Sequence, residues 1–167
     1  MGFLSSKIKK IENEIELLEM KNSVNFAIVT SDNFLLLASQ FRASIRSEII
    51  NLFGGYIEEG EDWKKALYRE LKEETNISKD DIHGFDILFE NKLVSPGYTT
   101  ERNTTCILFL NKKLDELNLK CNDEKENINI KKFYLSKYTI KELAKETETL
   151  KLYLTLKELN KYTLRRG

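Results

Sequence analysis

The stretch that decides the fold covers residues 55–77 and reads GYIEEGEDWKKALYRELKEETNI. From Asp62 to Thr75 it repeats apolar residues at the three- and four-residue spacing of an α-helix, and Asp is a residue type that caps helix N-termini. Just ahead of the loop, Gly54 and Gly55 end the expected preceding strand. The segment therefore predicts a strand, a polar loop and a helix, in that order.

The predicted helix carries acidic residues on its apolar side. On a wheel of about 100° per residue, the apolar side holds Trp63, Ala66, Leu67 and Leu71, and the opposite side holds Lys64, Lys65, Tyr68 and Lys72. Glu70 and Glu74 fall within about 20° of Trp63, and Glu73 lies at the edge of the apolar side. Such a sequence is ordinarily interpreted as a run of charged residues exposed to solvent, in which Arg69 pairs with Glu73.

The direction of Glu70 and Glu74 argues against that interpretation. Inward carboxylates repel one another and are costly to desolvate unless something positive lies among them. A hard divalent cation such as Mg²⁺ prefers oxygen ligands and would relieve both costs. The glycines before the loop would let a backbone carbonyl approach the same ion.

The rest of the chain predicts a mixed sheet with helices packed on it. Strands are expected at residues 24–30, 34–41, 48–53, 82–94, 103–111 and 128–135, a loop at 112–127, and one or two helices at 139–163. In residues 5–21, Ile8, Ile11, Ile15 and Leu18 recur at a spacing of three to four and predict an amphipathic helix. With no repeat and no linker rich in Pro, Gly or Ser, residues 1–167 are expected to form one α/β (α+β) layer sandwich. Its expected parts are an N-terminal helix within 1–22, a core at 23–135 and a C-terminal helical segment at 136–167.

Composition excludes several classes of protein. The 167 residues are 41% hydrophobic, enough for one core, and 27 basic residues balance 27 acidic ones, so a long-range field toward nucleic acid is missing. Apolar runs such as 34–38 fall far short of the roughly 20 residues of a membrane helix, and the N-terminus is too charged for a signal peptide. A cytoplasmic protein is therefore expected. One histidine and two separated cysteines argue against a zinc site or a His-based triad, which leaves carboxylates to carry the chemistry.

The 55–77 segment resembles the Nudix box, G-x5-E-x7-R-E-U-x-E-E-x-G-U, in which U is aliphatic. Gly55, Glu61 and the run 69–77 match every position except the last glycine, where Asn76 stands. Asn is the next best residue for a left-handed helix C-cap. The resemblance implies a Nudix hydrolase: an α/β/α sandwich with a mixed β-sheet that uses Mg²⁺ or Mn²⁺ and water to cleave a nucleoside diphosphate linked to another moiety X.

The resemblance also implies roles for residues of the box. Glu70, Glu73, Glu74 and the Gly54 carbonyl would bind the metal, and Glu73 is also a candidate acid/base group. Arg69 would be one of the catalytic residues and would, together with Glu61, orient the loop and helix.

Three segments outside the box are similar to ADP-ribose pyrophosphatases and related nucleoside diphosphate sugar hydrolases. They are residues 40–42, 95–102 and 124–128. The similarity implies substrate contacts for Arg42, Ser95, Gly97 and Glu101, with Glu101 alternatively a metal contact, a general base at Glu124 and a metal-site carboxylate at Glu126.

Each of these residues also has a simpler explanation. Ser95-Pro96-Gly97 is a common turn, the acids of 124–128 stand in a charged loop that solvent would cover, and Arg42 would brace the sheet edge. Core packing is expected for the aromatic residues Trp63, Tyr56, Phe85 and Phe89.

The expected substrate is a small nucleoside diphosphate derivative, with ADP-ribose or an ADP-sugar as the best single choice and AMP plus a sugar phosphate as products. Dinucleotides and nucleoside triphosphates stay open as substrates. A Nudix-like sensor that binds without turnover is the main alternative, which the full set of box acids disfavours; zero net charge disfavours RNA. In the subfamily, the strand entering the box ends in a Leu-Pro-Ala-Gly-like run, which this chain lacks, and an N-terminal β region is common. The helix expected at 5–21 would dock on its own domain or form a homodimer contact.

Overall fold

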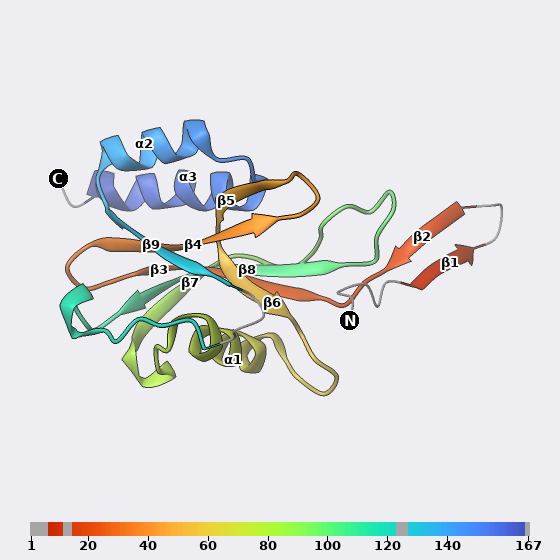
Figure 1. Ribbon diagram of the computed structural model, residues 1–167, viewed down its shortest axis with the longest axis horizontal. Coiled ribbons are helices and arrows are strands. Elements are labelled where there is room, and N and C mark those ends of the chain that lie inside the picture. Colours follow the sequence, from red (N-terminus) through yellow and green to blue (C-terminus); the bar gives the residue numbers. More distant parts are fainter. Residues whose placement is uncertain (1–6, 12–14, 123–126, 166–167) are drawn as a thin grey trace.

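The computed structural model describes residues 7–11, 15–122 and 127–165, and they form a three-layered body with a projecting hairpin (Figure 1). Helix α1 (Trp63–Thr75) lies on one face of a seven-stranded sheet. Helices α2 (Lys137–Glu146) and α3 (Leu150–Arg165) lie on the other. The predicted α/β/α sandwich with a mixed sheet is confirmed.

Strand β3 is the centre of the sheet. The strands are β3 (Ser23–Val29), β4 (Phe34–Arg42), β5 (Ser47–Asn51), β6 (Phe53–Tyr56), β7 (Ile82–Leu93), β8 (Arg102–Leu110) and β9 (Asn129–Tyr134). Short 3₁₀ turns, η1 (Lys79–Asp81) and η2 (Leu114–Glu116), lie between them. β3 runs antiparallel to β4 and β6 and parallel to β8, and its register sets Val24 beside both Gly55 and Thr104. The strand that leads into α1 and the strand that follows the Ser-Pro-Gly loop therefore flank β3, one on each side.

Alternation along β3 divides the core between the two faces of the sheet. Val24, Phe26 and Ile28 pack with the apolar residues of α1, and Ala27 and Val29 pack with those of α2 and α3. Because successive side chains of a strand point to opposite faces, a strand covered on both sides is apolar along its length. Residue 25 belongs to the α3 face by this alternation, yet it is an asparagine.

The strand expected at 48–53 is two strands. β5 pairs with β4, whereas β6 pairs with β3, so the chain changes partner at Leu52. The Asn51 side chain accepts a hydrogen bond from the Leu52 N–H at 2.8 Å and supports this break. Sequence periodicity does not report a change of partner, because both strands alternate with the same period.

The helix predicted for residues 5–21 is wrong. Residues Lys7–Ile11 (β1) and Ile15–Glu19 (β2) form an antiparallel pair whose register sets Ile8 opposite Leu18 and Ile11 opposite Ile15. The same register sets Lys7 opposite Glu19 and Lys10 opposite Glu16. Opposite charges at paired positions favour antiparallel strands. A spacing of three to four residues thus also fits a pair of antiparallel strands.

The hairpin joins the body through the loop before β8. Leu18 donates its N–H to the Tyr98 carbonyl at 2.8 Å and accepts from the Thr100 N–H at 3.1 Å. No helix in the part of the chain that the model describes is both long and apolar enough to cross a lipid bilayer.

Candidate active site

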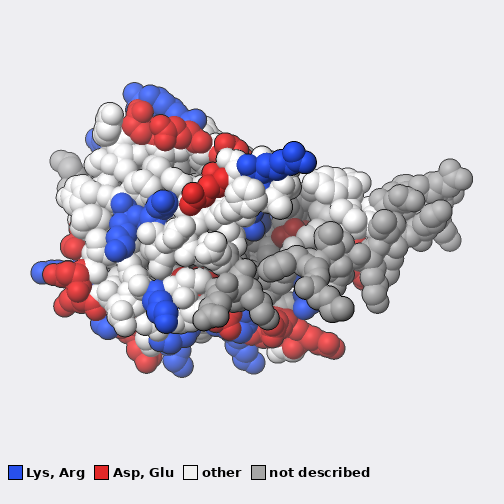
Figure 2. Space-filling model, viewed as in Figure 1, with Lys and Arg blue, Asp and Glu red and all other residues white. Residues whose placement is uncertain are grey.

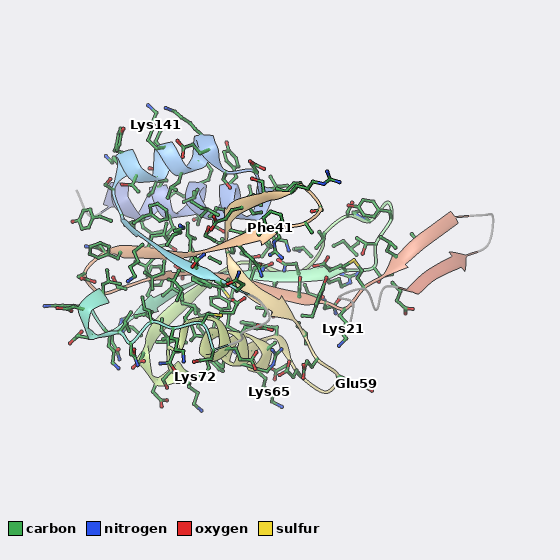
Figure 3. All side chains as sticks on the ribbon, viewed as in Figure 1. Lys21, Phe41, Glu59, Lys65, Lys72 and Lys141 are labelled. Carbon is green, nitrogen blue, oxygen red and sulfur yellow. The ribbon has the colours of Figure 1, made fainter. Side chains whose placement is uncertain are left out.

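Helix α1 presents Glu70 and Glu74 inward, as its sequence predicts. Asp62 caps it by accepting the Lys65 N–H at 2.9 Å, and Asn76 ends it in the left-handed conformation with φ 62°. Glu70 and Glu74 are 8% and 2% exposed. The lysines of the opposite side are exposed, and Lys65 and Lys72 point away from the sheet in Figure 3. Tyr68, expected on the solvated side, is half-buried and packs against the core instead.

Two adjacent glycines give these carboxylates room. Gly54 adopts φ +132°, and a Cβ there would lie 2.0 Å from the Val24 carbonyl oxygen. A Cβ on Gly55 would lie 2.2 Å from Glu70 Oε1. The Gly54 N–H donates to Glu74 Oε2 at 2.7 Å, so β6 and α1 are joined through the acidic residues themselves.

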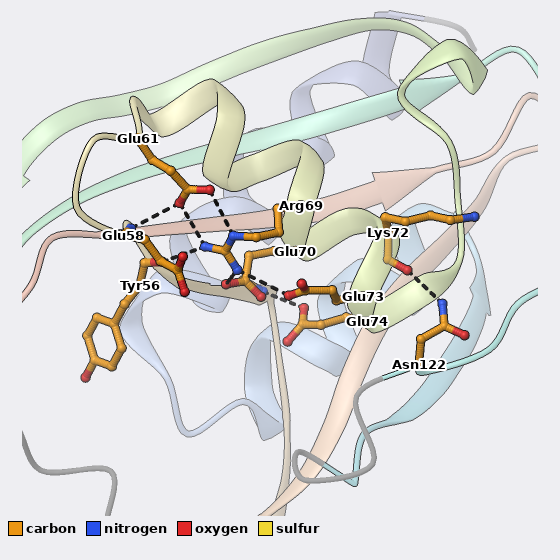
Figure 4. A network of polar contacts seen from close by, with 10 residues as sticks. Tyr56, Glu58, Glu61, Arg69, Glu70, Lys72, Glu73, Glu74 and Asn122 are labelled. Carbon is orange, nitrogen blue, oxygen red and sulfur yellow. Dashed lines mark hydrogen bonds and ion pairs between the residues drawn. The ribbon is translucent and has the colours of Figure 1, made fainter.

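Arg69 lies among three of the box acids (Figure 4). Its guanidinium donates to Glu61 from Nε and Nη2, both at 3.0 Å, and from Nη1 to Glu70 at 2.7 Å and to Glu73 at 3.2 Å. It also donates to the Tyr56 carbonyl at 2.9 Å. The hydrogen bonds with Glu61 raise the pKa of the Arg69 guanidinium and lower that of the Glu61 carboxyl. Arg69 therefore ties the loop before α1 to the helix.

The ion pair between Arg69 and Glu61 should stabilise the folded protein by an amount that depends on pH. The Glu61 carboxyl has a folded pKa below the reference value of 4.5, so its contribution is complete above about pH 4.5 and is lost as the pH falls through the folded pKa. In urea unfolding at pH 7, Glu61→Gln should lower the free energy of unfolding. At pH 3 the difference from the wild type should shrink, and a difference that stays constant with pH would contradict the assignment.

One pocket of about 1070 Å³ collects most of the predicted site residues. Gly54, Arg69, Glu70 and Glu73 line it, and so do Arg42 and Glu101 from outside the box. Tyr56 and Phe89, expected in the core, line it as well. Burial raises the pKa of the Tyr56 hydroxyl, and the negative Glu101 raises it further while Arg42 opposes both. The sheet and α1 thus bring together groups from distant segments.

Three predicted contacts lie elsewhere. Glu74 is not among the residues that line the pocket; it lies beneath Gly54. Ser95 and Gly97 do not line it either: the Ser95 carbonyl accepts the Tyr98 and Thr99 N–H groups in a turn.

Glu124 and Glu126 fall outside the described residues. The chain just before them is attached to the end of α1, because the Asn122 N–H donates to the Glu73 carbonyl at 2.6 Å and its Nδ2 to the Lys72 carbonyl at 2.9 Å. Figure 4 shows the second of these bonds.

Sequence reasoning missed a group of polar residues in the same pocket, namely Ser23, Asn25, Asn103 and Lys151. The sequence nevertheless contains a pattern that could have identified these residues. Asn25 shares the alternation of the buried Ala27, and Lys151 lies one helical turn before the buried Thr155. Polar residues at core positions of a strand or helix are the same kind of signal that Glu70 provides.

The pocket's donor set fits a hard cation. Within the described chain, no three acidic, histidine or cysteine side chains converge as a ready-made metal cage, and Arg69 supplies positive charge among the carboxylates. Mg²⁺ commonly binds through one or two carboxylates together with waters and substrate phosphates. Glu70, Glu73 and Gly54 supply only oxygen donors to one pocket, which suits that mode of binding.

The charge on the surface is mixed. Basic and acidic side chains lie interspersed over the face in Figure 2 rather than in one basic stripe, as expected for a chain with 27 residues of each sign.

Comparison with known proteins identifies the family. The sequence model of the NUDIX domain matches residues 21–159, which include both α1 and the pocket. No curated protein matches the chain. The chain therefore belongs to the NUDIX family, and it is a hydrolase of phosphoric anhydrides that acts on nucleoside diphosphate derivatives.

Proposed function

We propose that this hydrolase cleaves the pyrophosphate bond of ADP-ribose or an ADP-sugar, giving AMP and a sugar phosphate. The observation that carries the proposal is the pocket itself, in which the box residues Glu70 and Glu73 share one space with Arg42 and Glu101. Its volume, about 1070 Å³, leaves room for a nucleoside diphosphate with an attached group, since ligand pockets usually span roughly 300–1,000 Å³.

The residues of the site have separate proposed roles in binding metal and substrate. Glu70, Glu73, Glu74 and the Gly54 carbonyl would hold Mg²⁺ or Mn²⁺, which when bound would neutralise charge on the pyrophosphate and make water a better nucleophile. Arg69 holds Glu61, Glu70 and Glu73 in place. Glu101 contacts the sugar, and Arg42 contacts phosphate or ribose. In the reaction one phosphorus gains the water oxygen while its bond to the bridging oxygen breaks, the other phosphate leaves with that oxygen, and the general base takes up a proton of the water.

A substrate panel tests the proposal. The protein is incubated with Mg²⁺ or Mn²⁺ and ADP-ribose, nucleotide sugars, dinucleotides or oxidised nucleoside triphosphates, and products are separated by chromatography. AMP and ribose 5-phosphate from ADP-ribose are the expected result. Preferred turnover of dinucleotides or triphosphates would overturn the substrate assignment, and binding of ADP-ribose without turnover of any compound would favour a sensor.

Glu124 is proposed as the general base and Glu126 as a further metal-site carboxylate. Glu124→Gln should lower kcat by about a hundredfold, in the range of general-base catalysis, and should change the acidic limb of the pH profile with little change in KM. Glu126→Gln should instead raise the Mg²⁺ concentration needed for half-maximal rate. If Glu124→Gln retains a normal rate and pH profile, another residue is the base.

A further inference from the structure

A network of polar side chains forms one wall of the pocket on the α3 face of the sheet. Asn103 Nδ2, on β8, donates to Ser23 Oγ and to Asn25 Oδ1 of β3, both at 2.8 Å. Ser23 Oγ in turn donates to Glu101 Oε1 at 2.6 Å. Asn103 is 2% exposed and Ser23 6%. Paired strands thus hold the Glu101 carboxylate in a defined position.

Lys151 reaches this network from the first turn of α3. Its Nζ donates to Asn25 Oδ1 at 2.8 Å and lies 4.0 Å from Glu101 Oε1. The side chain is 31% exposed and that of Glu101 is 13% exposed, so both are largely enclosed yet still open to the pocket. Burial lowers the pKa of the Lys151 amine, and the nearby Glu101 opposes that shift.

The separation of the two charged groups leaves room for a ligand atom. A direct hydrogen bond would bring the nitrogen and oxygen to roughly 2.7–3.2 Å, and 4.0 Å exceeds this. One oxygen atom can lie about 2.8 Å from both atoms. Such an atom would have to accept a hydrogen bond from the ammonium and donate one to the carboxylate.

The pair discriminates between chemical groups. A phosphate oxygen would be repelled by Glu101, and a cation would be repelled by Lys151. A hydroxyl has one donor and two acceptor lone pairs, and it satisfies both groups at once.

We propose that Lys151 and Glu101 form a hydroxyl-binding pair that selects substrates in which X is a sugar, and that Lys151 is a specificity-determining residue. The inference rests on the proposed function and deepens it. Lys151 lies outside the box and outside residues 40–42, 95–102 and 124–128, so its role follows from its place in the fold.

The experiment compares two substrates and two variants. The substrates are the best nucleoside diphosphate sugar of the panel and ADP whose β-phosphate carries only a methyl group. Lys151→Met removes the ammonium at nearly constant length, and Lys141→Met is the matched control, because Lys141 is an exposed lysine on α2 that points away from the body (Figure 3). Lys151→Met should lower the ratio of kcat/KM for the sugar compound over the methyl compound by roughly tenfold to a hundredfold, the effect of losing a charged hydrogen bond. Lys141→Met should keep the ratio of the wild type.

A second measurement needs no variant. The wild-type protein is assayed with analogues of the sugar substrate that each lack one hydroxyl, and one analogue should show a KM raised by at least about tenfold. An unchanged ratio in folded Lys151→Met overturns the inference, as do deoxy analogues that all match the parent compound. Failure of the wild type to hydrolyse any nucleoside diphosphate derivative is a different result, since it removes the proposed function on which the inference rests.

Discussion

We expect Glu74→Gln to lower the rate of pyrophosphate hydrolysis by about a hundredfold or more, while the protein remains as stable as the wild type or becomes slightly more stable without metal. The catalytic loss is expected because a metal-bound transition state gains several kcal/mol of charge stabilisation, and each 1.4 kcal/mol corresponds to about a tenfold rate. Glu74 is 2% exposed and lies one turn from the buried Glu70. Removal of one of two neighbouring carboxylates relieves their repulsion.

Glu74→Gln removes the charge of the side chain and keeps its size and its hydrogen-bonding oxygen. A glutamine can still accept the Gly54 N–H through its side-chain oxygen, as Glu74 does at 2.7 Å. The measurements are kcat and KM at several Mg²⁺ concentrations, and urea unfolding without metal. Glu59→Gln is the control, because Glu59 is an exposed acid of the same motif. A normal rate in Glu74→Gln would show that Glu74 only supports the Gly54 peptide and would remove it from the metal ligands.

Gly54→Ala should lose stability, whereas Gly55→Ala should lose activity, although the two positions are adjacent. Gly54 has φ +132°, and its added Cβ would meet the backbone of Val24 at 2.0 Å. Strain at such a φ costs about 1–3 kcal/mol, and overpacking against a backbone that cannot yield adds about 1–3 kcal/mol. We therefore expect Gly54→Ala to lose a large part of a typical free energy of unfolding of about 5–15 kcal/mol.

Gly55→Ala should fold and lose activity. Its Cβ would meet only the end of the Glu70 side chain, at 2.2 Å from Oε1, and a side chain can move aside. Displacement of that carboxylate by about 1 Å should reduce kcat/KM by tenfold or more. Urea unfolding and steady-state kinetics on both variants check this contrast. Equal stability of Gly54→Ala and the wild type would contradict the backbone argument, and a normal rate in Gly55→Ala would contradict the role of the Glu70 position.

The box region could be predicted in detail because its signals are local. A capping Asp62, an apolar repeat and a C-terminal Asn76 define α1, and the same repeat places Glu70 and Glu74 on the buried side. Helix geometry relates residues three and four apart in the chain, so no knowledge of the remaining fold is needed. The strands expected at 82–94 and 103–111 are β7 and β8, which pair with each other, as neighbouring strands along a chain commonly do.

Other elements could not be decided locally. The Ile and Leu residues of 8–18 satisfy a helical spacing and also the register of the β1–β2 hairpin. The choice between them depends on contacts such as those of Leu18 with Tyr98 and Thr100, 80 or more positions away in the chain. Short apolar repeats remain ambiguous between helix and strand until such contacts are known.

The amino-acid sequence by itself determined that one helix turns its carboxylates inward beside two glycines, because backbone geometry converts residue spacing directly into direction. Only the tertiary structure decided which other groups face them. Lys151 meets Asn25 across 126 positions of the chain, and Glu101 meets Ser23 across 78. Such meetings depend on the parallel pairing of β3 with β8 and on the packing of α3 over that sheet. Packing is a property of the whole chain, since each contact forms only when the layers that hold both partners have assembled.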